Sequence, residues 1–311
     1  TAEIIILERD EYVSFANCGL PYHIGGEIED RAALLLQTPE SLKASLNLDV
    51  RTGHEVLAIE RTNKRVTVRK RATGEEYTES YDKLVLCQGA NPVRPPLPGI
   101  DHPRLFTLRN IPDMDAIKAV VDQGATRAVI VGGGYIGMEV AEALRHRGLA
   151  VDLVEMLPQL MPPLDVEMAR DLAYHMESHG VTLHLGVTAQ SFVDVQGQIQ
   201  VNLSDGVTLL SDLAIMAVGV RPASTLARET GLAIGPRGGI KVDPHMRTSD
   251  PDIYAAGDMV EVTDTITGEP ALIPLAGPAN RQGRIVADHI FGRTSAYQST
   301  QGTAVLKVFE M

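Results

Sequence analysis

Short apolar runs alternate with longer stretches of mixed residues through the middle of the chain. The runs at residues 128–131, 150–154 and 182–185 are mostly apolar, as the strands of a buried sheet are. The stretches at 135–147 and 165–179 repeat their apolar positions with the spacing of an amphipathic helix. This β-α-β-α-β order predicts a parallel sheet with helices on its faces.

The same reasoning predicts further elements on both sides of this region, where short apolar or alternating runs are bounded by glycine, proline and polar residues. We expect strands at residues 3–7, 54–60, 66–70, 76–80, 83–87, 198–203, 208–210 and 213–218, a strand ending at 254–258, helices at 39–45, 113–122 and 280–291, and a new strand within 302–311. The first strand has no earlier element to pair with, so we expect further sequence upstream of it.

Length and charge limit the class of protein. A chain of 311 residues is long enough for two domains. The proline- and glycine-rich residues 89–99 and the turn at 219–222 predict the places where the chain crosses between them. A net charge of −12 argues against nucleic acid as a partner. The sequence lacks the run of about 18 apolar residues that a membrane span needs, so we expect no membrane insertion.

The two cysteines, Cys18 and Cys87, are far apart and form no CxxC pair. With no recognisable secretion signal, this usage predicts a cytoplasmic protein that uses one thiol rather than a disulfide. Cys18 directly follows a turn and opens an expected helix, where free backbone N–H groups and the helix dipole favour the thiolate. The alternative is that Cys18 is a small buried hydrophobic residue.

A glycine turn follows the strand at 128–131. Gly132, Gly134 and Gly137 form G-x-G-x-x-G directly before a helix, the arrangement that holds a dinucleotide pyrophosphate. The next strand ends at Glu155, where an acid bonds the ribose hydroxyls. Because an acid repels a 2′-phosphate, NADH is expected, with NADPH as the alternative. Glu8 ends the first strand in the same way, as though a second dinucleotide were held there.

Four segments together resemble one enzyme family. Residues 14–22, 132–137, 254–258 and 274–281 are similar to motifs of the pyridine nucleotide-disulfide oxidoreductases. Within that family they resemble the branch of coenzyme A-disulfide and coenzyme A-persulfide reductases, which have a single active-site cysteine. The resemblance covers nearly the whole chain.

The resemblance implies an α/β fold with two Rossmann-like dinucleotide-binding domains, in which the FAD domain is discontinuous and the NAD domain is inserted into it. It assigns residues 1–110 to the first part of the FAD-binding domain, 111–233 to the NAD(P)H-binding domain, 234–297 to the second part of the FAD-binding domain, and 298–311 to the start of a C-terminal interface domain. Homodimers form through that last domain in the family, so the resemblance implies a homodimer.

The resemblance also implies a role for each matching residue. The FAD contacts are Glu8, Arg9, Ser14, Cys87, Gly89, Gly257, Asp258, Leu275 and Ala276. The NAD contacts are Gly132, Gly134, Tyr135, Ile136, Gly137, Glu155 and Gly219. The thiol substrate is met by Ser14, Asn17 and Arg51, while Cys18 is the nucleophile and Asn17 supports it. For Arg51 an ordinary surface arginine is the alternative, and for Glu139, expected near the flavin, a solvated helix acid. No metal is expected.

The implied function is an FAD-dependent oxidoreductase that passes electrons from NADH through the flavin to Cys18, which reduces a disulfide or persulfide of a coenzyme A-type thiol. An NADH oxidase or peroxidase that uses a cysteine sulfenic acid is the first alternative, and a flavin-bearing interaction protein is the second. The sequence departs from the family in three ways. It lacks the N-terminal glycine loop for FAD, it stops early in the interface domain, and Cys87-Gln88 stands where Ser-Pro is usual. Some members append a rhodanese module, on which the sequence is silent.

Overall fold

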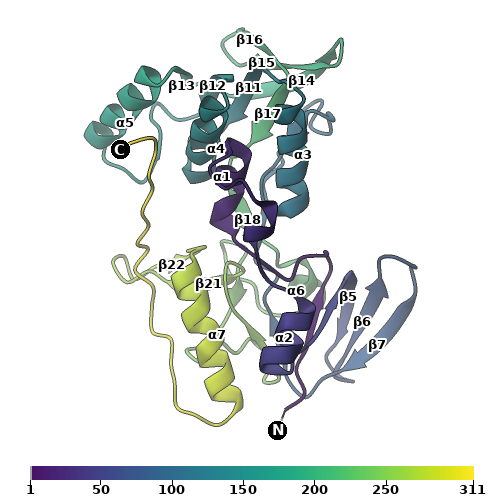
Figure 1. The fold of residues 1–311 in the computed structure, drawn as a ribbon. Helices are drawn as coiled ribbons and strands as arrows, with labels where there is room; N and C mark the ends of the chain where they lie inside the picture. The colour runs from purple at the N-terminus through teal and green to yellow at the C-terminus, as the bar shows by residue number, and fades with distance from the viewer. Residues whose placement is uncertain (1) are drawn as a thin grey trace. The chain divides into compact units, whose positions relative to one another are not determined.

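The computed structural model describes residues 2–311 and divides them into two compact units. The central unit comprises Ser14–Leu36, Pro92–Val220 and Leu306–Met311. The flanking unit comprises residues 2–13 with Gln37–Asn91 and Arg221–Val305. The expected α/β class is confirmed, since both units combine helices with parallel strand pairs (Figure 1). No helix within the described residues is long and apolar enough to cross a membrane.

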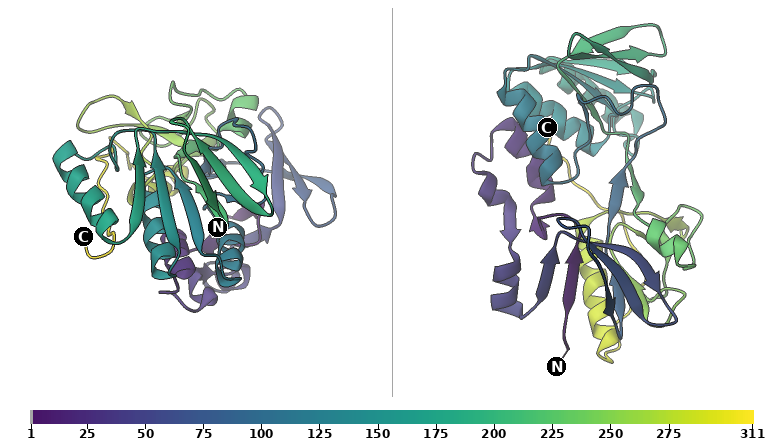
Figure 2. Two further views of the ribbon diagram at one scale, coloured as in Figure 1. Left: turned by 90° about the horizontal axis from the view of Figure 1, so that it is seen from above. Right: turned by 90° about the vertical axis from the view of Figure 1, so that its right-hand side faces the viewer.

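A five-stranded parallel sheet forms the core of the central unit (Figure 2). Its strands, in spatial order, are β10 (Leu105–Phe106), β17 (Leu213–Met216), β11 (Arg127–Val131), β12 (Ala150–Glu155) and β13 (Val181–Leu185). Three helices accompany the sheet, namely α3 (Ile111–Asp122), α4 (Tyr135–His146) and α5 (Val166–Ser178). Strands β11, β12 and β17 are buried almost throughout, which explains why they appear in the sequence as apolar runs.

An antiparallel sheet packs against this parallel sheet. It consists of β14 (Ala189–Val195), β15 (Gln198–Leu203) and β16 (Thr208–Ser211). Phe192, Ile199 and Val201 from it share one hydrophobic cluster with Val129 and Met216 of the parallel sheet. Strand β14 was not expected from the sequence, because alternate apolar positions in so short a segment give a weak signal.

The segment that carries Cys18 belongs to the central unit. It contains β2 (Ser14–Phe15), the 3₁₀ turn η1 (Asn17–Gly19), α1 (Leu20–Gly25), the 3₁₀ turn η2 (Arg31–Leu34) and β3 (Leu35–Gln37). Helix α1 lies against α4, where Gly25 is so close that a Cβ on it would stand 3.2 Å from the Cα of Ala143. Arg31 ties the segment to α3 through two contacts of 2.8 and 2.7 Å with the carboxylate of Asp115.

The flanking unit is built from smaller sheets. Two are parallel pairs, β1 (Ile5–Glu8) with β4 (Asp49–Thr52) and β8 (Leu84–Leu86) with β20 (Ile253–Ala255). Two have three strands: β5 (His54–Glu60), β6 (Arg65–Lys70) and β7 (Glu76–Ser80); and β19 (Ile240–Lys241), β21 (Val260–Thr263) and β22 (Pro270–Ala271). Its helices are α2 (Pro39–Leu46), α6 (Thr225–Glu229) and α7 (Ala276–Ile290). Short strands β9 (Ala90–Pro92) and β18 (Val220–Pro222) lie where the chain passes between the units.

Two expectations need correction. The new strand expected within residues 302–311 is wrong, because this segment pairs with no strand; it ends in a turn, with Val308 and Phe309 buried and Val305 96% exposed. Helix α7 begins at Ala276 rather than at residue 280. Pro278 falls in its first turn, where a missing backbone N–H costs the helix nothing.

The buried centre of β11 gives a stability test. Ile130 is fully buried, so Ile130→Ala should lower the free energy of unfolding by about 2–5 kcal/mol through lost burial and the cavity left behind. Val193 on β14 is 44% exposed, and Val193→Ala should cost well under half as much. Urea unfolding followed by circular dichroism measures both, and equal losses would contradict the assigned core.

Candidate active site

Two of the three glycines in the turn after β11 are packed so closely against backbone that no side chain would fit. Gly132 has a φ of +116°, and a Cβ there would stand 2.4 Å from the carbonyl oxygen of Ala217. A Cβ on Gly137 would stand 2.0 Å from the carbonyl oxygen of Gly132. Gly134, in contrast, faces open space, with nothing within 4 Å of a Cβ built on it. The turn is therefore closed on its inner side and open where a ligand would approach.

Glu155 ends β12 beside this turn and is only 9% exposed. Its Oε2 accepts a hydrogen bond of 2.7 Å from the backbone N–H of Gly133, and its Oε1 accepts one of 2.8 Å from Leu157. These bonds hold the Glu155 side chain at the mouth of the turn. No side chain caps the N-terminus of α4, so its first backbone N–H groups can receive an anion. The residues fit a dinucleotide whose ribose meets Glu155.

The remaining expected NAD contacts surround this turn. Tyr135 is the first residue of α4 and is 41% exposed, and Ile136 follows it half-buried. Gly219, after β17, is exposed with a φ of +101°. All of them lie in the central unit with the glycine turn.

Cys18 is exposed, which removes the alternative of a small buried hydrophobic residue. It lies in η1, the 3₁₀ turn directly before α1, rather than in the α-helix itself. The turn is held by hydrogen bonds from Ala16 N–H to the Leu34 carbonyl (2.8 Å) and from Gly19 N–H to the Ala16 carbonyl (2.9 Å). Asn17 is exposed next to the thiol, and Ser14 is half-buried in β2. Both share the central unit with Cys18.

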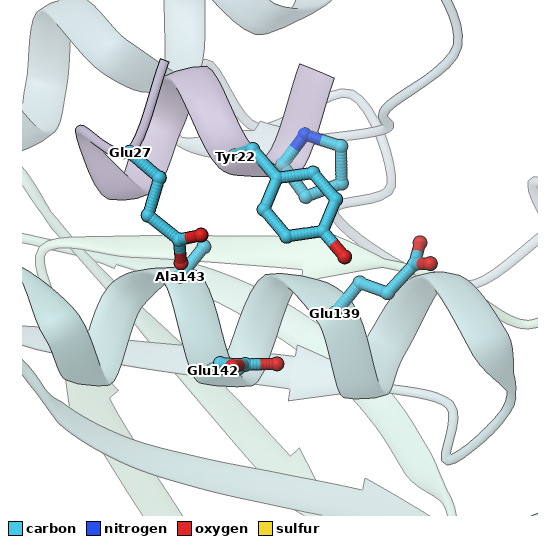
Figure 3. Close-up of a pocket in the computed structure, with 6 residues that line it drawn as sticks. Tyr22, Glu27, Glu139, Glu142 and Ala143 are labelled. Atoms are coloured by element: carbon cyan, nitrogen blue, oxygen red, sulfur yellow. The ribbon is translucent and has the colours of Figure 1, made fainter. Parts of the chain in front are cut away.

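An acidic pocket, lined by Tyr22, Glu27, Glu139 and Glu142 with Pro21 and Ala143, lies where α1 meets α4 (Figure 3). Tyr22 follows Cys18 by four residues, and the two groups interact electrostatically. Burial, with the charges of Glu139 and Glu142, raises the pKa of the Tyr22 phenol. Burial and the Glu142 charge likewise raise the pKa of Glu139. Glu139 is thus not a solvated helix acid; it holds its proton to higher pH than an exposed carboxyl does.

Residues expected to contact FAD lie mainly in the flanking unit. The Oε1 of Glu8 accepts a 2.8 Å hydrogen bond from the N–H of Asp10, two residues on, as Glu155 does from Leu157. Gly257 has a φ of +81° and donates to Gln282 Oε1 at 2.7 Å, which fixes the turn that leads to the half-buried Asp258.

Helix α7 offers the flanking unit's own anion-binding end. Leu275 precedes it without a side-chain cap, and Ala276 is exposed at its start, so backbone N–H groups of a 15-residue helix remain available. With Glu8 and Asp258, these features fit a flavin nucleotide held by its ribose, ribityl chain and ring.

Three further expected contacts are less clearly placed for binding. Arg9 is exposed and lies 3.8 Å from Asp10. Gly89 has a φ of +69°. Part of Cys87 is exposed, yet desolvation by its surroundings raises the pKa of its thiol. Because the thiolate is the reactive form, Cys87 is the poorer nucleophile at neutral pH.

Arg51, expected to face coenzyme A, is already engaged by its neighbours. Its guanidinium contacts Asp49 at 2.6 Å and Glu79 at 2.6 Å and donates to the Tyr77 hydroxyl at 3.3 Å. The hydrogen bonds to Asp49 and Tyr77 raise its pKa further. This network joins β4 to β7 and favours a structural role, so a substrate role for Arg51 stays a prediction.

The fold and the glycine turn define a protein that binds dinucleotides through a Rossmann-type unit. Residues 1–283 match the family described as pyridine nucleotide-disulphide oxidoreductase, and the chain belongs to that family. The resemblance seen in the sequence is thereby confirmed.

Curated relatives match almost the entire chain. An NADH oxidase of Enterococcus faecalis is 37% identical over 310 residues, covering 99% of this chain and 69% of the relative. A coenzyme A disulfide reductase of Staphylococcus haemolyticus is 35% identical over 311 residues, with the same coverage of 99% and 69%.

Solved structures agree in fold. The reduced CoADR-RHD protein of Bacillus anthracis is 49% identical with a TM-score of 0.95, over 99% of this chain and 55% of that one. An NAD-dependent persulfide reductase from A. fulgidus is 35% identical with a TM-score of 0.96, over 99% of this chain and 58% of that one. The chain thus spans little more than half the length of these two proteins.

The glycine turn gives a paired test of nucleotide binding. Gly134→Ala should fold normally but weaken NADH binding by roughly tenfold, about 1.4 kcal/mol, because the new methyl group would occupy the space open to a pyrophosphate. Gly137→Ala should destabilise the protein itself by about 1–3 kcal/mol or more, since its Cβ meets backbone. Equilibrium NADH titration and thermal unfolding of both variants separate the effects; equal loss of stability would contradict the assignment.

Proposed function

We propose that this protein uses NADH and FAD to reduce a disulfide or persulfide of a coenzyme A-type thiol, with Cys18 as the single redox sulfur. The observation that carries the proposal is the placement of Cys18. Its thiol is exposed on a rigid turn, and the helix that follows packs against α4, the helix whose N-terminus forms the nucleotide turn. Few purely structural roles call for an exposed thiol so close in the fold to a dinucleotide site.

The cofactors would be held by residues already described. The pyrophosphate of NADH would bind at the turn Gly132–Gly137, and its ribose hydroxyls would meet Glu155. FAD would be held by Glu8, Asp258 and the N-terminus of α7. When bound, the flavin supplies two-electron transfer from the nicotinamide to sulfur, which protein side chains cannot perform.

Cys18 accounts for the sulfur chemistry without a second protein thiol. The Cys18 thiolate attacks one sulfur of a disulfide R–S–S–R, forming a Cys18–S–S–R bond and releasing RS⁻, which takes up a proton. Two electrons, originally from NADH, then cleave that mixed disulfide, returning Cys18 to the thiolate and releasing a second RS⁻. NADH, one proton and R–S–S–R thus become NAD⁺ and two RSH.

The residues around Cys18 suit this cycle. The exposed Asn17 side chain and the free N–H groups of the turn would stabilise the thiolate. Burial, together with neighbouring carboxylates, raises the pKa values of Glu139 and Tyr22 above their ordinary values, and the two groups would be proton donors on the α4 side of this segment. Cys87, whose thiol pKa is raised, would not compete as the nucleophile.

The substrate assignment rests on the sequence around Cys18 and on the relatives. Asn17-Cys18-Gly19-Leu20-Pro21-Tyr22 matches the branch that acts on coenzyme A disulfide or persulfide. A relative of equal coverage is named NADH oxidase, so oxygen reduction through a cysteine sulfenic acid is the second candidate. A cytoplasmic location and a homodimer formed through a C-terminal domain complete the proposal.

Substitution of the redox sulfur tests the proposal. Cys18→Ser should lower NADH-dependent reduction of coenzyme A disulfide or persulfide by roughly a thousandfold or more, because serine cannot form the mixed disulfide. Anaerobic bleaching of the flavin by NADH should persist in the same variant, which shows that cofactor binding is intact.

Oxygen consumption distinguishes the second candidate. The proposal predicts that the wild-type protein oxidises NADH slowly in air until a coenzyme A disulfide or persulfide is added. Rapid oxygen uptake without any sulfur substrate, or full disulfide reduction by Cys18→Ser, would reject the proposal.

A further inference from the structure

Three potential metal ligands converge beside α5, away from the glycine turn. His175 lies in the last turn of that helix and His179, four residues later, is its C-cap residue, so the two rings lie next to each other with centroids 4.4 Å apart. Glu310, in the last segment of the central unit, reaches both: its Oε2 lies 3.0 Å from His179 Nε2 and 3.9 Å from His175 Nε2. Figure 1 shows the C-terminal end of the chain beside α5.

Hydrogen bonding determines which nitrogen of the neutral His179 ring carries the proton and which has a lone pair directed at Glu310. His179 Nδ1 lies 2.9 Å from the backbone carbonyl of His175, and a carbonyl oxygen only accepts, so Nδ1 carries the proton. In the neutral ring, Nε2 then points a lone pair at the Glu310 carboxylate across 3.0 Å. Two facing lone pairs repel, so this contact requires a cation or an additional proton between them.

The buried Nε2 of His175 is the second observation that points to a cation. This nitrogen finds no hydrogen-bond partner within residues 2–311. An unpaired buried nitrogen costs free energy unless something binds it. The buried ring of Phe309 stacks on His179, with centroids 4.1 Å apart, and so holds the neighbouring Glu310 beside the histidines.

We propose that His175, His179 and Glu310 bind one divalent transition-metal ion of the zinc type. Two imidazoles and one carboxylate are a ligand set typical of zinc, and the Nδ1–H bond of His179 to a carbonyl is the usual way such a ligand is oriented. Ligand atoms about 2.05 Å from a tetrahedral ion lie roughly 3.3 Å apart. The observed 3.0 and 3.9 Å separations bracket that value, so small side-chain shifts would complete the site.

The bound ion would fasten the segment Leu306–Met311 to α5. In its absence that segment is held mainly by Val308 and Phe309, the two buried side chains near its end. The site is independent of the proposed redox function, since none of its three ligands belongs to the nucleotide turn or to the Cys18 segment.

A second group must be distinguished from this one. Glu27, Glu142 and His146 also bring ligand atoms within 4.8 Å of one another. His146 Nδ1 already lies 3.1 Å from Glu27 Oε1, a distance at which the two can share a proton without a metal ion. Among the described residues, this group has no buried nitrogen without a hydrogen-bond partner like that of His175, so it serves as the comparison site for zinc binding.

Zinc titration by isothermal calorimetry tests the proposal. The metal-free protein carries Cys18→Ser and Cys87→Ser throughout, so that neither exposed thiol binds zinc. We expect one zinc ion per chain, and His175→Ala and His179→Ala should each weaken binding by roughly tenfold or more. Glu310→Gln should weaken it in the same direction. Two control variants should leave the affinity for zinc unchanged. They are His184→Gln, whose histidine lies on β13 and contacts Asp152, and Glu142→Gln.

A second measurement does not depend on the variants folding. Crystals of the protein soaked in zinc should show an anomalous peak between His175 Nε2, His179 Nε2 and Glu310 Oε2. Absence of zinc binding, binding that survives both histidine substitutions, or a peak at the Glu142 group instead would each overturn the proposal.

Discussion

The candidate site depends on one close approach between backbones. At Gly137 the first turn of α4 comes so near to the carbonyl of Gly132 that no side chain fits between them. This contact lets α4 begin close after the end of β11, with N-terminal N–H groups that no side chain caps and that could receive a pyrophosphate. The same helix then packs against α1, which follows the Cys18 turn. A single helix therefore joins the nucleotide turn to the thiol segment.

The electrostatic environment differs along α4, between its N-terminus and the pocket that it forms with α1. At its N-terminus the dipole and free N–H groups favour negative charge, which a dinucleotide supplies. Further along the helix, Glu139 and Glu142 line a pocket with Tyr22 where α1 packs, and burial together with these carboxylates raises the pKa values of Glu139 and Tyr22. The exposed thiol of Cys18 lies on the same segment as Tyr22. Two packed helices thus connect the glycine turn, the acidic pocket and the Cys18 segment.

Local pattern was sufficient for the central β-α-β-α-β order, because its strands are buried on both faces and its helices are amphipathic. The tight turn at Gly132, the close packing at Gly137 and the position of Glu155 at the end of β12 also followed from spacing, whereas their contacts with a nucleotide stay predictions. The final segment was mispredicted because a strand-like run forms a strand only if a partner strand is available; here Val308 and Phe309 are buried, and the Phe309 ring packs on His175 and His179 at the end of α5. The acidic pocket and the His175 group join residues distant in sequence, for which no local signal exists. Whether Asn17, Ser14 and Arg51 meet the substrate stays a prediction.

The account's central claim is that Cys18 alone carries the substrate's sulfur. Mass spectrometry of proteolytic peptides from the oxidised protein, after incubation with coenzyme A disulfide, tests it most directly. The account predicts a coenzyme A adduct on the peptide that contains Cys18, lost on addition of NADH, and none on the peptide that contains Cys87. An adduct that forms on Cys87 instead, or one on Cys18 that NADH does not remove, would contradict it.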